Sequence, residues 1–108
     1  MPDVLQYIDR SGASPFGDWF MALPPQEAAK IATAITRLSL GNFSRVKGVG
    51  KGVFEIKIDF GPGYRIYFGK DGEMLVILLH GGTKKRQQAD IETAIAYWQD
   101  YKKRKARG

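Results

Sequence analysis

The feature that most constrains the fold is a strict alternation of apolar and polar side chains in the middle of the chain. The apolar positions are Phe54, Ile56, Ile58 and Phe60, and the polar positions between them are Glu55, Lys57 and Asp59. Successive side chains of a β-strand point to opposite faces, so the pattern predicts a half-buried strand.

A second alternating segment, residues 64–68, returns after the turn Gly61-Pro62-Gly63. If this turn closes a simple hairpin, Asp59 faces Arg65 and Lys57 faces Tyr67 on the polar side. The pair predicts an antiparallel meander, which continues through an Asp-Gly turn at 71–72 into the apolar run 74–79. That run suits a strand covered on both faces.

The remaining segments predict one more strand and three helices. Residues 4–8 read as a short strand, and Ser14 before Pro15 reads as the N-cap of a helix. Pro25 opens a second helix, which Gly41 ends. Its expected buried stripe is Ala28, Ile31, Ala32, Ile35 and Leu38. A last helix is predicted to begin near Asp90, and its apolar stripe consists of Ile91, Ala94, Ile95 and Trp98.

The glycine-rich segments 42–52 and 80–86 are predicted to be loops. The order of all these segments predicts one α+β domain over residues 1–108. We expect a mainly antiparallel four-stranded sheet with the helices packed on one side. Trp19, Met21 and Trp98 have the spacing of core residues. The basic tail at about 102–108 has no apolar face, so we expect it to fray.

Charge indicates a polyanionic partner. The net charge is +6, and residues 80–108 contain eight Lys or Arg against three Asp or Glu. RNA, DNA, an anionic membrane and an acidic protein all fit such a bias, and so does a face selected only for solubility. No apolar run is long enough to span a membrane, and no secretory signal precedes the first strand. The chain has no cysteine, which excludes disulfides and permits a reducing compartment without proving one. We expect a cytoplasmic protein.

Three motifs together carry a family resemblance. They are Gly41-Asn42-Phe43, the segment Gly-Pro-Gly-Tyr-Arg at 61–65 with the strand that follows it, and Gly-Gly-Thr-Lys-Lys-Arg-Gln at 81–87 running on to Ile91. In order and spacing the chain resembles toxins of the RelE/ParE superfamily, in the phage-derived, HigB-like "addiction module killer" branch. The match covers nearly the whole chain, and its specificity lies in the combination of motifs.

The resemblance implies a RelE-like fold and the toxin half of a type II toxin–antitoxin module. The expected partners are a cognate antitoxin, often a helix-turn-helix protein that also binds operator DNA, together with messenger RNA and the ribosome. The implied activity is metal-independent cleavage of mRNA, with no cofactor and no metal site. Two alternatives stay open: a ParE-like inhibitor of DNA gyrase without RNase activity, and a non-toxic nucleic-acid-binding module.

RNA cleavage of this kind uses the 2′-hydroxyl as nucleophile and requires extra charge on the phosphate to be stabilised. Arg65 is the first candidate, because a guanidinium keeps its charge and binds phosphate through a planar fork. It is expected on the exposed face of its strand, where it could also pair with Asp59. Lys84 occupies the lysine position of the Gly-Gly-x-Lys motif and is the second candidate.

Other residues are candidates for RNA contacts or for the acid–base steps. His80, the only histidine, is a candidate base, although a histidine at a strand end is more often structural. Two more have open roles: Gln87 could bind RNA or sit in the helix's first turn, and Tyr67 could stack on a base or be half-buried. Lys57 shares the predicted face of Arg65 and is a further candidate contact. The remaining candidates are Arg45, Lys47 and Lys51, which are otherwise loop charges, and Lys85 and Arg86, for which a solvated charge run is the favoured interpretation.

The chain departs from better-known relatives in its acid–base groups. Some HigB toxins use two histidines, and RelE-type toxins place a tyrosine early in the last helix, where this chain has Ile91. Tyr97 and Tyr101 come later in that helix. The identities of the general acid and base therefore stay open.

Overall fold

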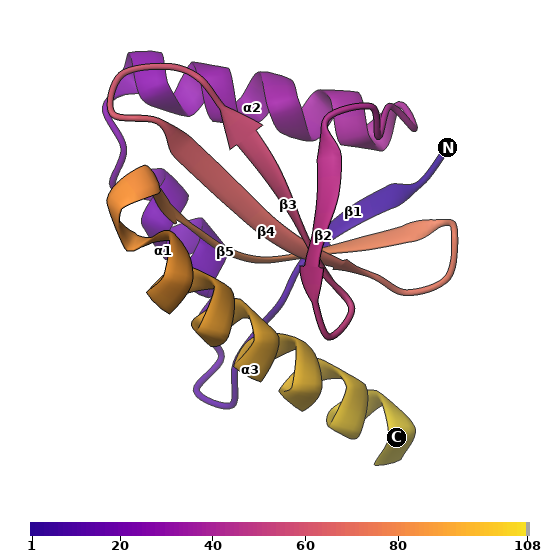
Figure 1. Ribbon diagram of the computed structural model, residues 1–108. Coiled ribbons are helices and arrows are strands. Elements are labelled where there is room, and N and C mark those ends of the chain that lie inside the picture. The colour runs from indigo at the N-terminus through magenta and orange to yellow at the C-terminus, as the bar shows by residue number, and fades with distance from the viewer. Residues whose placement is uncertain (108) are drawn as a thin grey trace.

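The chain forms a five-stranded mixed sheet flanked by three helices, seen in a computed structural model that describes residues 1–107 (Figure 1). The strand order is β1-β5-β4-β3-β2, and all neighbours are antiparallel except β1 and β5. The elements in chain order are β1 (Asp3–Gln6), α1 (Pro15–Met21), α2 (Pro25–Ser39), β2 (Val46–Gly50), β3 (Val53–Ile58), β4 (Tyr64–Lys70), β5 (Leu75–Thr83), the 3-10 turn η1 (Lys84–Arg86) and α3 (Gln87–Arg107). The α+β class and the mainly antiparallel pairing are confirmed, whereas the predicted number of four strands was wrong.

The additional strand is β2, which lies inside the predicted loop 42–52. It pairs with β3 through Val46 and Ile56, and through Lys47 and Glu55. The register shifts after Gly48, and the turn into β3 uses positive φ at Gly50, Lys51 and Gly52. Glycine lowers the intrinsic strand propensity of this segment. The edge of the existing sheet nevertheless offers backbone hydrogen-bonding partners, and strand propensities do not include this contribution.

The register of the β3–β4 hairpin differs from the predicted one by two residues. Lys57 lies opposite Arg65, and Glu55 lies opposite Tyr67. The connection spans residues 59–63, and it is closed by a hydrogen bond from the Gly63 amide to the Phe60 carbonyl (3.0 Å). Because the loop is longer than a three-residue turn, Glu55 rather than Asp59 becomes the acidic neighbour of Arg65.

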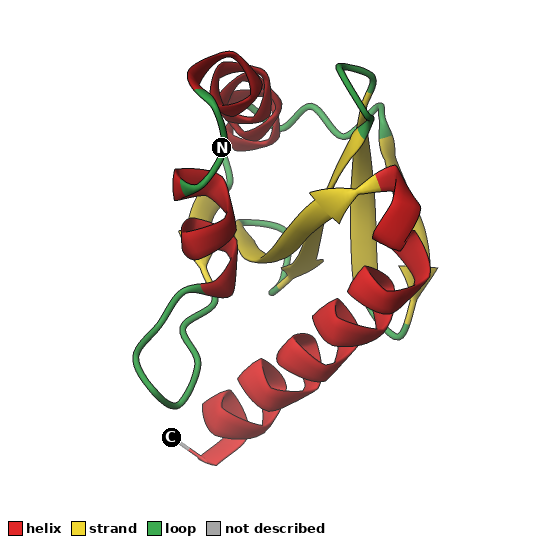
Figure 2. Cartoon of the chain, turned by 90° about the vertical axis from the view of Figure 1, so that its left-hand side faces the viewer, coloured by secondary structure: helices red, strands yellow, loops and turns green. Residues whose placement is uncertain are grey.

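Helices cover both faces of the sheet, not one as predicted (Figure 2). Helices α1 and α2 pack on the face that carries Ile56, Ile66 and Phe68. Helix α3 packs on the opposite face, over Val53, Tyr67 and other residues of a second apolar cluster. The central strand β4 is therefore buried on both sides, and its six residues from Tyr64 to Gly69 are all buried.

The two N-terminal helices follow their sequence signals closely. The Ser14 hydroxyl accepts the Gly17 amide (2.9 Å) and Pro15 opens α1, as predicted. In α2 the buried positions are Ile31, Ala34 and Leu38, whereas Ala32 is exposed. Met21 is 81% exposed at the end of α1, so its assignment to the core was wrong.

Glycines in β4 and β5 make space for large side chains from the helices. A Cβ atom at Gly69 would overlap the indole ring of Trp98 in α3, and one at Gly81 would overlap that of Trp19 in α1. The two indoles thus approach the sheet from opposite faces at positions that no other residue type permits.

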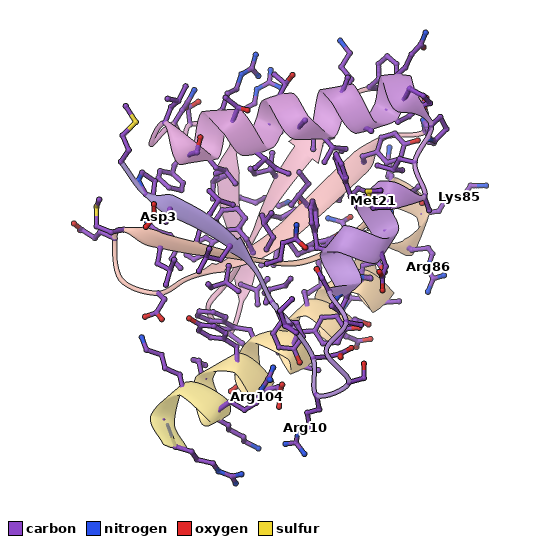
Figure 3. All side chains as sticks on the ribbon, turned by 180° about the vertical axis from the view of Figure 1, so that it is seen from behind. Asp3, Arg10, Met21, Lys85, Arg86 and Arg104 are labelled. Atoms are coloured by element: carbon purple, nitrogen blue, oxygen red, sulfur yellow. The ribbon has the colours of Figure 1, made fainter. Side chains whose placement is uncertain are left out.

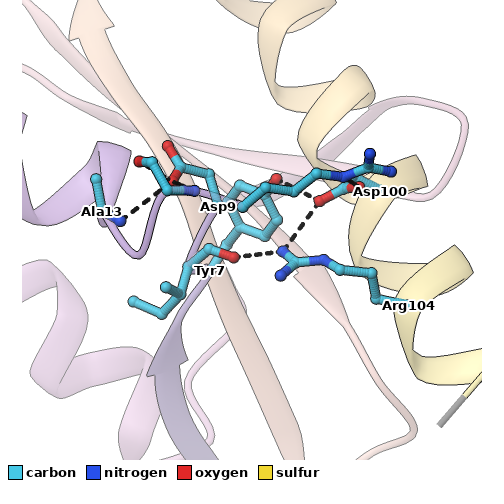
Figure 4. Close-up of polar contacts among 8 residues, drawn as sticks. Tyr7, Asp9, Ala13, Asp100 and Arg104 are labelled. Carbon is cyan, nitrogen blue, oxygen red and sulfur yellow. Dashed lines mark hydrogen bonds and ion pairs between the residues drawn. The ribbon is translucent and has the colours of Figure 1, made fainter.

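Helix α3 continues to Arg107 and so includes the predicted tail from residue 102 onward, of which residue 108 lies outside the described residues. Asp100 holds the helix to the N-terminal segment: it accepts the Tyr7 hydroxyl (2.6 Å) and pairs with Arg104 (2.9 Å) (Figure 4). Arg104 also donates to the Ile8 carbonyl, and Lys105 pairs with Asp71. Two of the five cations in this part of the helix, Arg104 and Lys105, are therefore paired. None of the helices described, residues 1–107, is long and apolar enough to cross a membrane.

Gly69→Ala should destabilise the protein by about 1–3 kcal/mol, because the new methyl group must displace Trp98 from the sheet. Urea unfolding followed by tryptophan fluorescence measures the loss. Gly48→Ala in β2 is the matched control, since a Cβ there meets nothing within 4 Å, and it should change stability by less than about 0.5 kcal/mol. Equal losses at the two positions would contradict this account of Gly69.

Stability should fall as the pH rises from about 10 towards 12. Burial, reinforced by the hydrogen bond to Asp100, raises the pKa of Tyr7 from 10.0 to about 12. The unfolded chain therefore releases this proton at a lower pH than the folded protein, and the contribution of Tyr7 is complete below pH 10. Chemical denaturation of wild type and Tyr7→Phe between pH 8 and 12 tests this: the stability difference between them should shrink with pH. A constant difference would exclude a role for Tyr7 ionisation.

Candidate functional site

The site is built around Arg65, which is buried rather than exposed as predicted. Arg65 is 6% exposed and lies on the face of β4 that α3 covers. Its Nε is 3.6 Å from Glu55 Oε2, and Glu55 on β3 is itself 2% exposed. The sequence signal for Arg65 was its place in an alternating strand, and that signal could not show that a helix covers the polar face.

Glu55 is the centre of the polar contacts around Arg65. Gln87, at the first position of α3, donates from Nε2 to Glu55 Oε2 (2.9 Å). Lys47 Nζ on β2 lies 3.9 Å from the other carboxylate oxygen. Three predicted site residues thus meet at one carboxylate that sequence reasoning assigned no role. Its only sequence signal was a place on the same strand face as Lys57.

Arg65 keeps hydrogen-bonding capacity that the protein does not use. Its Nε and Nη1 are buried without a hydrogen-bond partner, since the contact with Glu55 is an ion pair at a longer distance. The neighbouring Tyr67 hydroxyl is likewise buried and unpartnered. Burial, with the negative charges of Glu55 and Asp90 adding to it, raises the pKa of Tyr67, so its phenol stays protonated near neutral pH. Buried polar groups are normally paired, so such a concentration indicates a binding site.

Arg65 lines an open pocket of about 380 Å³ at the end of the β3–β4 hairpin, which we call the Arg65 pocket. Its lining residues are Lys57, Asp59, Phe60, Gly61, Pro62, Gly63, Arg65 and Lys84. The Lys84 amide donates to the Gly63 carbonyl (3.0 Å), which ties the hairpin loop to η1. Three cations and one carboxylate surround the pocket, so it favours an anion such as a phosphate group.

His80 faces Asp90 and does not line the Arg65 pocket. Its Nε2 is 3.0 Å from Asp90 Oδ1, and its Nδ1 is buried without a partner. Asp90, 4% exposed in the first turn of α3, fits against Gly82, where any Cβ would overlap its carboxylate. The two glycines of the Gly-Gly motif thus leave space on opposite faces of β5, Gly81 for Trp19 and Gly82 for Asp90. Asp90 had a sequence signal, since helix N-termini favour acidic residues, but nothing indicated its burial.

The other predicted contacts are dispersed. Tyr67 is fully buried and exposes no ring for stacking. Lys51 lies in the β2–β3 turn, at the opposite end of β3 from the Arg65 pocket. Lys85 and Arg86 are exposed on η1 and point away from the molecule (Figure 3). The predicted loop 80–86 divides into the end of β5, to Thr83, and η1. Within residues 1–107, no group of three or more histidine, aspartate or glutamate side chains is arranged to hold a metal ion.

The fold and the site define a small basic α+β protein with a cation-lined pocket at the end of its β3–β4 hairpin. Residues 18–99 match the model of the phage-derived protein Gp49-like family (DUF891). An uncharacterized protein of Haemophilus influenzae is 46% identical over 80 residues, which cover 73% of this chain and 81% of that protein. The chain therefore belongs to the phage-derived Gp49-like family, a toxin-like family of toxin–antitoxin modules. The RelE/ParE and HigB assignments stay predictions.

Replacing Glu55 alone should lower the free energy of unfolding more than replacing Glu55 and Arg65 together. Glu55→Leu leaves the Arg65 charge buried without its neighbour, a change that typically costs about 3–5 kcal/mol. In Glu55→Leu/Arg65→Leu no buried charge is left unpaired, so the double variant should lose less than the sum of the two single losses. Urea unfolding of the four proteins completes the cycle. Strictly additive losses would show that the pair does not interact.

Proposed function

We propose that this protein is the toxin of a type II toxin–antitoxin module and a metal-independent endonuclease that cleaves mRNA on the ribosome. It would belong to the HigB-like branch of the RelE/ParE toxins and adopt their fold. The observation that carries the proposal is the buried Arg65, which has unpartnered guanidinium nitrogens and lines an open cationic pocket. Membership of the Gp49-like family supports the toxin assignment.

The proposed reaction is transesterification at a phosphodiester. The 2′-oxygen forms a bond to phosphorus as its proton leaves, and the bond from phosphorus to the 5′-oxygen breaks as that oxygen takes up a proton. Negative charge grows on the non-bridging oxygens at the transition state. Arg65 would bind these oxygens, and Glu55 would hold the guanidinium in place through the 3.6 Å contact.

Lys84 and Lys57 would add positive charge at the rim of the pocket. Both side chains are exposed and line it, so either can contact a phosphate without any rearrangement. An ammonium group beside the 5′-oxygen could also supply the proton to the leaving group. In this proposal His80 is a positioning residue, because its Nε2 engages Asp90 and it lies outside the pocket lining.

The proposal includes a cognate antitoxin as the main protein partner. In this class of module the antitoxin is commonly a helix-turn-helix protein, so contact with operator DNA would be made through it. Such a partner would neutralise the toxin, and a cytoplasmic location would follow from an mRNA target.

Induced expression in bacteria with mapping of transcript ends tests the proposal. Wild type should arrest growth and create new ends inside translated messages. Lys84→Ala should lower the frequency of these ends by at least about tenfold, a loss typical of one missing electrostatic contact in a transition state. Lys84 is exposed, so the change should leave stability within about 0.5 kcal/mol.

Lys85→Ala is the matched control, since it removes the same charge from the next residue, which is exposed and does not line the pocket. It should cleave like wild type. Arg65→Ala should abolish cleavage, provided that circular dichroism shows the purified variant to be folded. Growth arrest with intact messages and damaged DNA would replace the RNase proposal with gyrase inhibition, and no arrest at all would refute the toxin assignment.

A further inference from the structure

A second hollow, of about 430 Å³, lies between α2 and the β2–β3 edge of the sheet. We call it the α2 groove. Its walls are formed by Lys30 and Arg37 of α2, by Arg45 in the connection to β2, and by Lys57 of β3. No function was predicted for Lys30 or Arg37, and both side chains are exposed.

The groove carries an excess of uncompensated positive charge. Its one acidic lining residue is Asp59, which lies 3.8 Å from Lys57 Nζ. Lys30, Arg37 and Arg45 are all exposed, and within residues 1–107 none of the three makes an ion pair. Cations converging from a helix, a loop and a strand on one hollow create a potential that attracts a polyanion.

The α2 groove adjoins the Arg65 pocket. Both hollows are lined by Lys57, Asp59 and Phe60, so they meet at the end of β3. A nucleic acid strand that places one phosphate in the Arg65 pocket must leave that pocket on both sides. Because the two hollows share a wall, the α2 groove lies beside the path of the strand as it leaves the pocket on one side.

The chemistry of the groove fits a single strand of RNA better than an apolar peptide. Its apolar floor includes Ala34 and Ile56, which are 9% and 6% exposed, so little apolar surface is available to a partner helix. Phe60 is half-buried where the two hollows meet, with Lys30 Nζ 5.3 Å from its ring centroid. An aromatic ring beside cations is the arrangement that single-strand-binding proteins use to stack a base and hold its phosphates.

We propose that the α2 groove holds the single-stranded RNA that flanks the phosphate in the Arg65 pocket, with Lys30, Arg37 and Arg45 against its backbone. The inference rests on the proposed function and deepens it by naming the extended substrate site. It also assigns a role to the exposed face of α2.

The test measures binding of 2′-O-methyl RNA, which cannot be cleaved, by fluorescence anisotropy with a 12-nucleotide and a 4-nucleotide strand. Lys30→Ala/Arg37→Ala should weaken binding of the longer strand by about tenfold and leave the short strand within twofold of wild type. Losing two phosphate contacts should also reduce the slope of log affinity against log salt by about 1.4.

Lys103→Ala/Arg107→Ala is the matched control, because it removes two exposed cations from the far end of α3 and lowers the net charge equally. It should bind both strands within about twofold of wild type. Equal losses in the two double variants would overturn the proposal by reducing the groove to a general charge effect. So would a groove variant that binds RNA normally but no longer binds its co-expressed antitoxin, which would make the groove a protein-docking site.

The outcome for the groove is separable from that of the proposed function. If wild type creates new transcript ends in cells but the groove variant binds the longer strand like wild type, the groove proposal fails and the endonuclease stands. If wild type neither cleaves messages nor binds either strand, both proposals fail together.

Discussion

The ion pair between Arg65 and Glu55 is the constraint on which the rest of the site depends. A guanidinium and a carboxylate on adjacent strands are enclosed between the sheet and the first turns of α3. Burying two charges is costly, and an apolar pair of similar volume would generally be at least as stable. The Arg65 side chain lines the Arg65 pocket, so what the cost secures is a cation held at a fixed position beside that pocket.

The sequence determined the local structure well and the long-range arrangement poorly. The helix signals at Ser14 and Pro25 were read correctly, because they depend on neighbours in the chain. The alternating segment does form a strand, but this strand ends at Ile58 and its polar face is buried at Glu55. Strand β2 was missed because its partner, not its composition, makes it a strand. The parallel pairing of β1 with β5 joins residues more than 70 positions apart, such as Asp3 and Leu75, and no local pattern encodes it.

The candidate site shows the same difference between what local sequence patterns predict and what depends on long-range contacts. Sequence motifs identified Arg65, Lys84 and Gln87, and the structure brings all three to one end of the β3–β4 hairpin. They did not identify Glu55 or Asp90, since an acidic residue in a strand or in a first helical turn is ordinary until its burial is known. The two-residue difference in the hairpin register separated the predicted Asp59–Arg65 pair from the observed one. A loop's length, which sets register, is weakly encoded when glycine and proline permit several closures.

The tether between Tyr7 and Asp100 has a consequence for how the protein is made. Strand β1 can join the sheet only beside β5, and its end is then fixed by a side chain near the end of α3. The same helix closes over Arg65 and supplies Gln87 to Glu55. Contacts between such distant parts of the chain form late in folding. During synthesis, the site around Arg65 would therefore be complete only after α3 has left the ribosome, so a chain that lacks this helix would lack the assembled site.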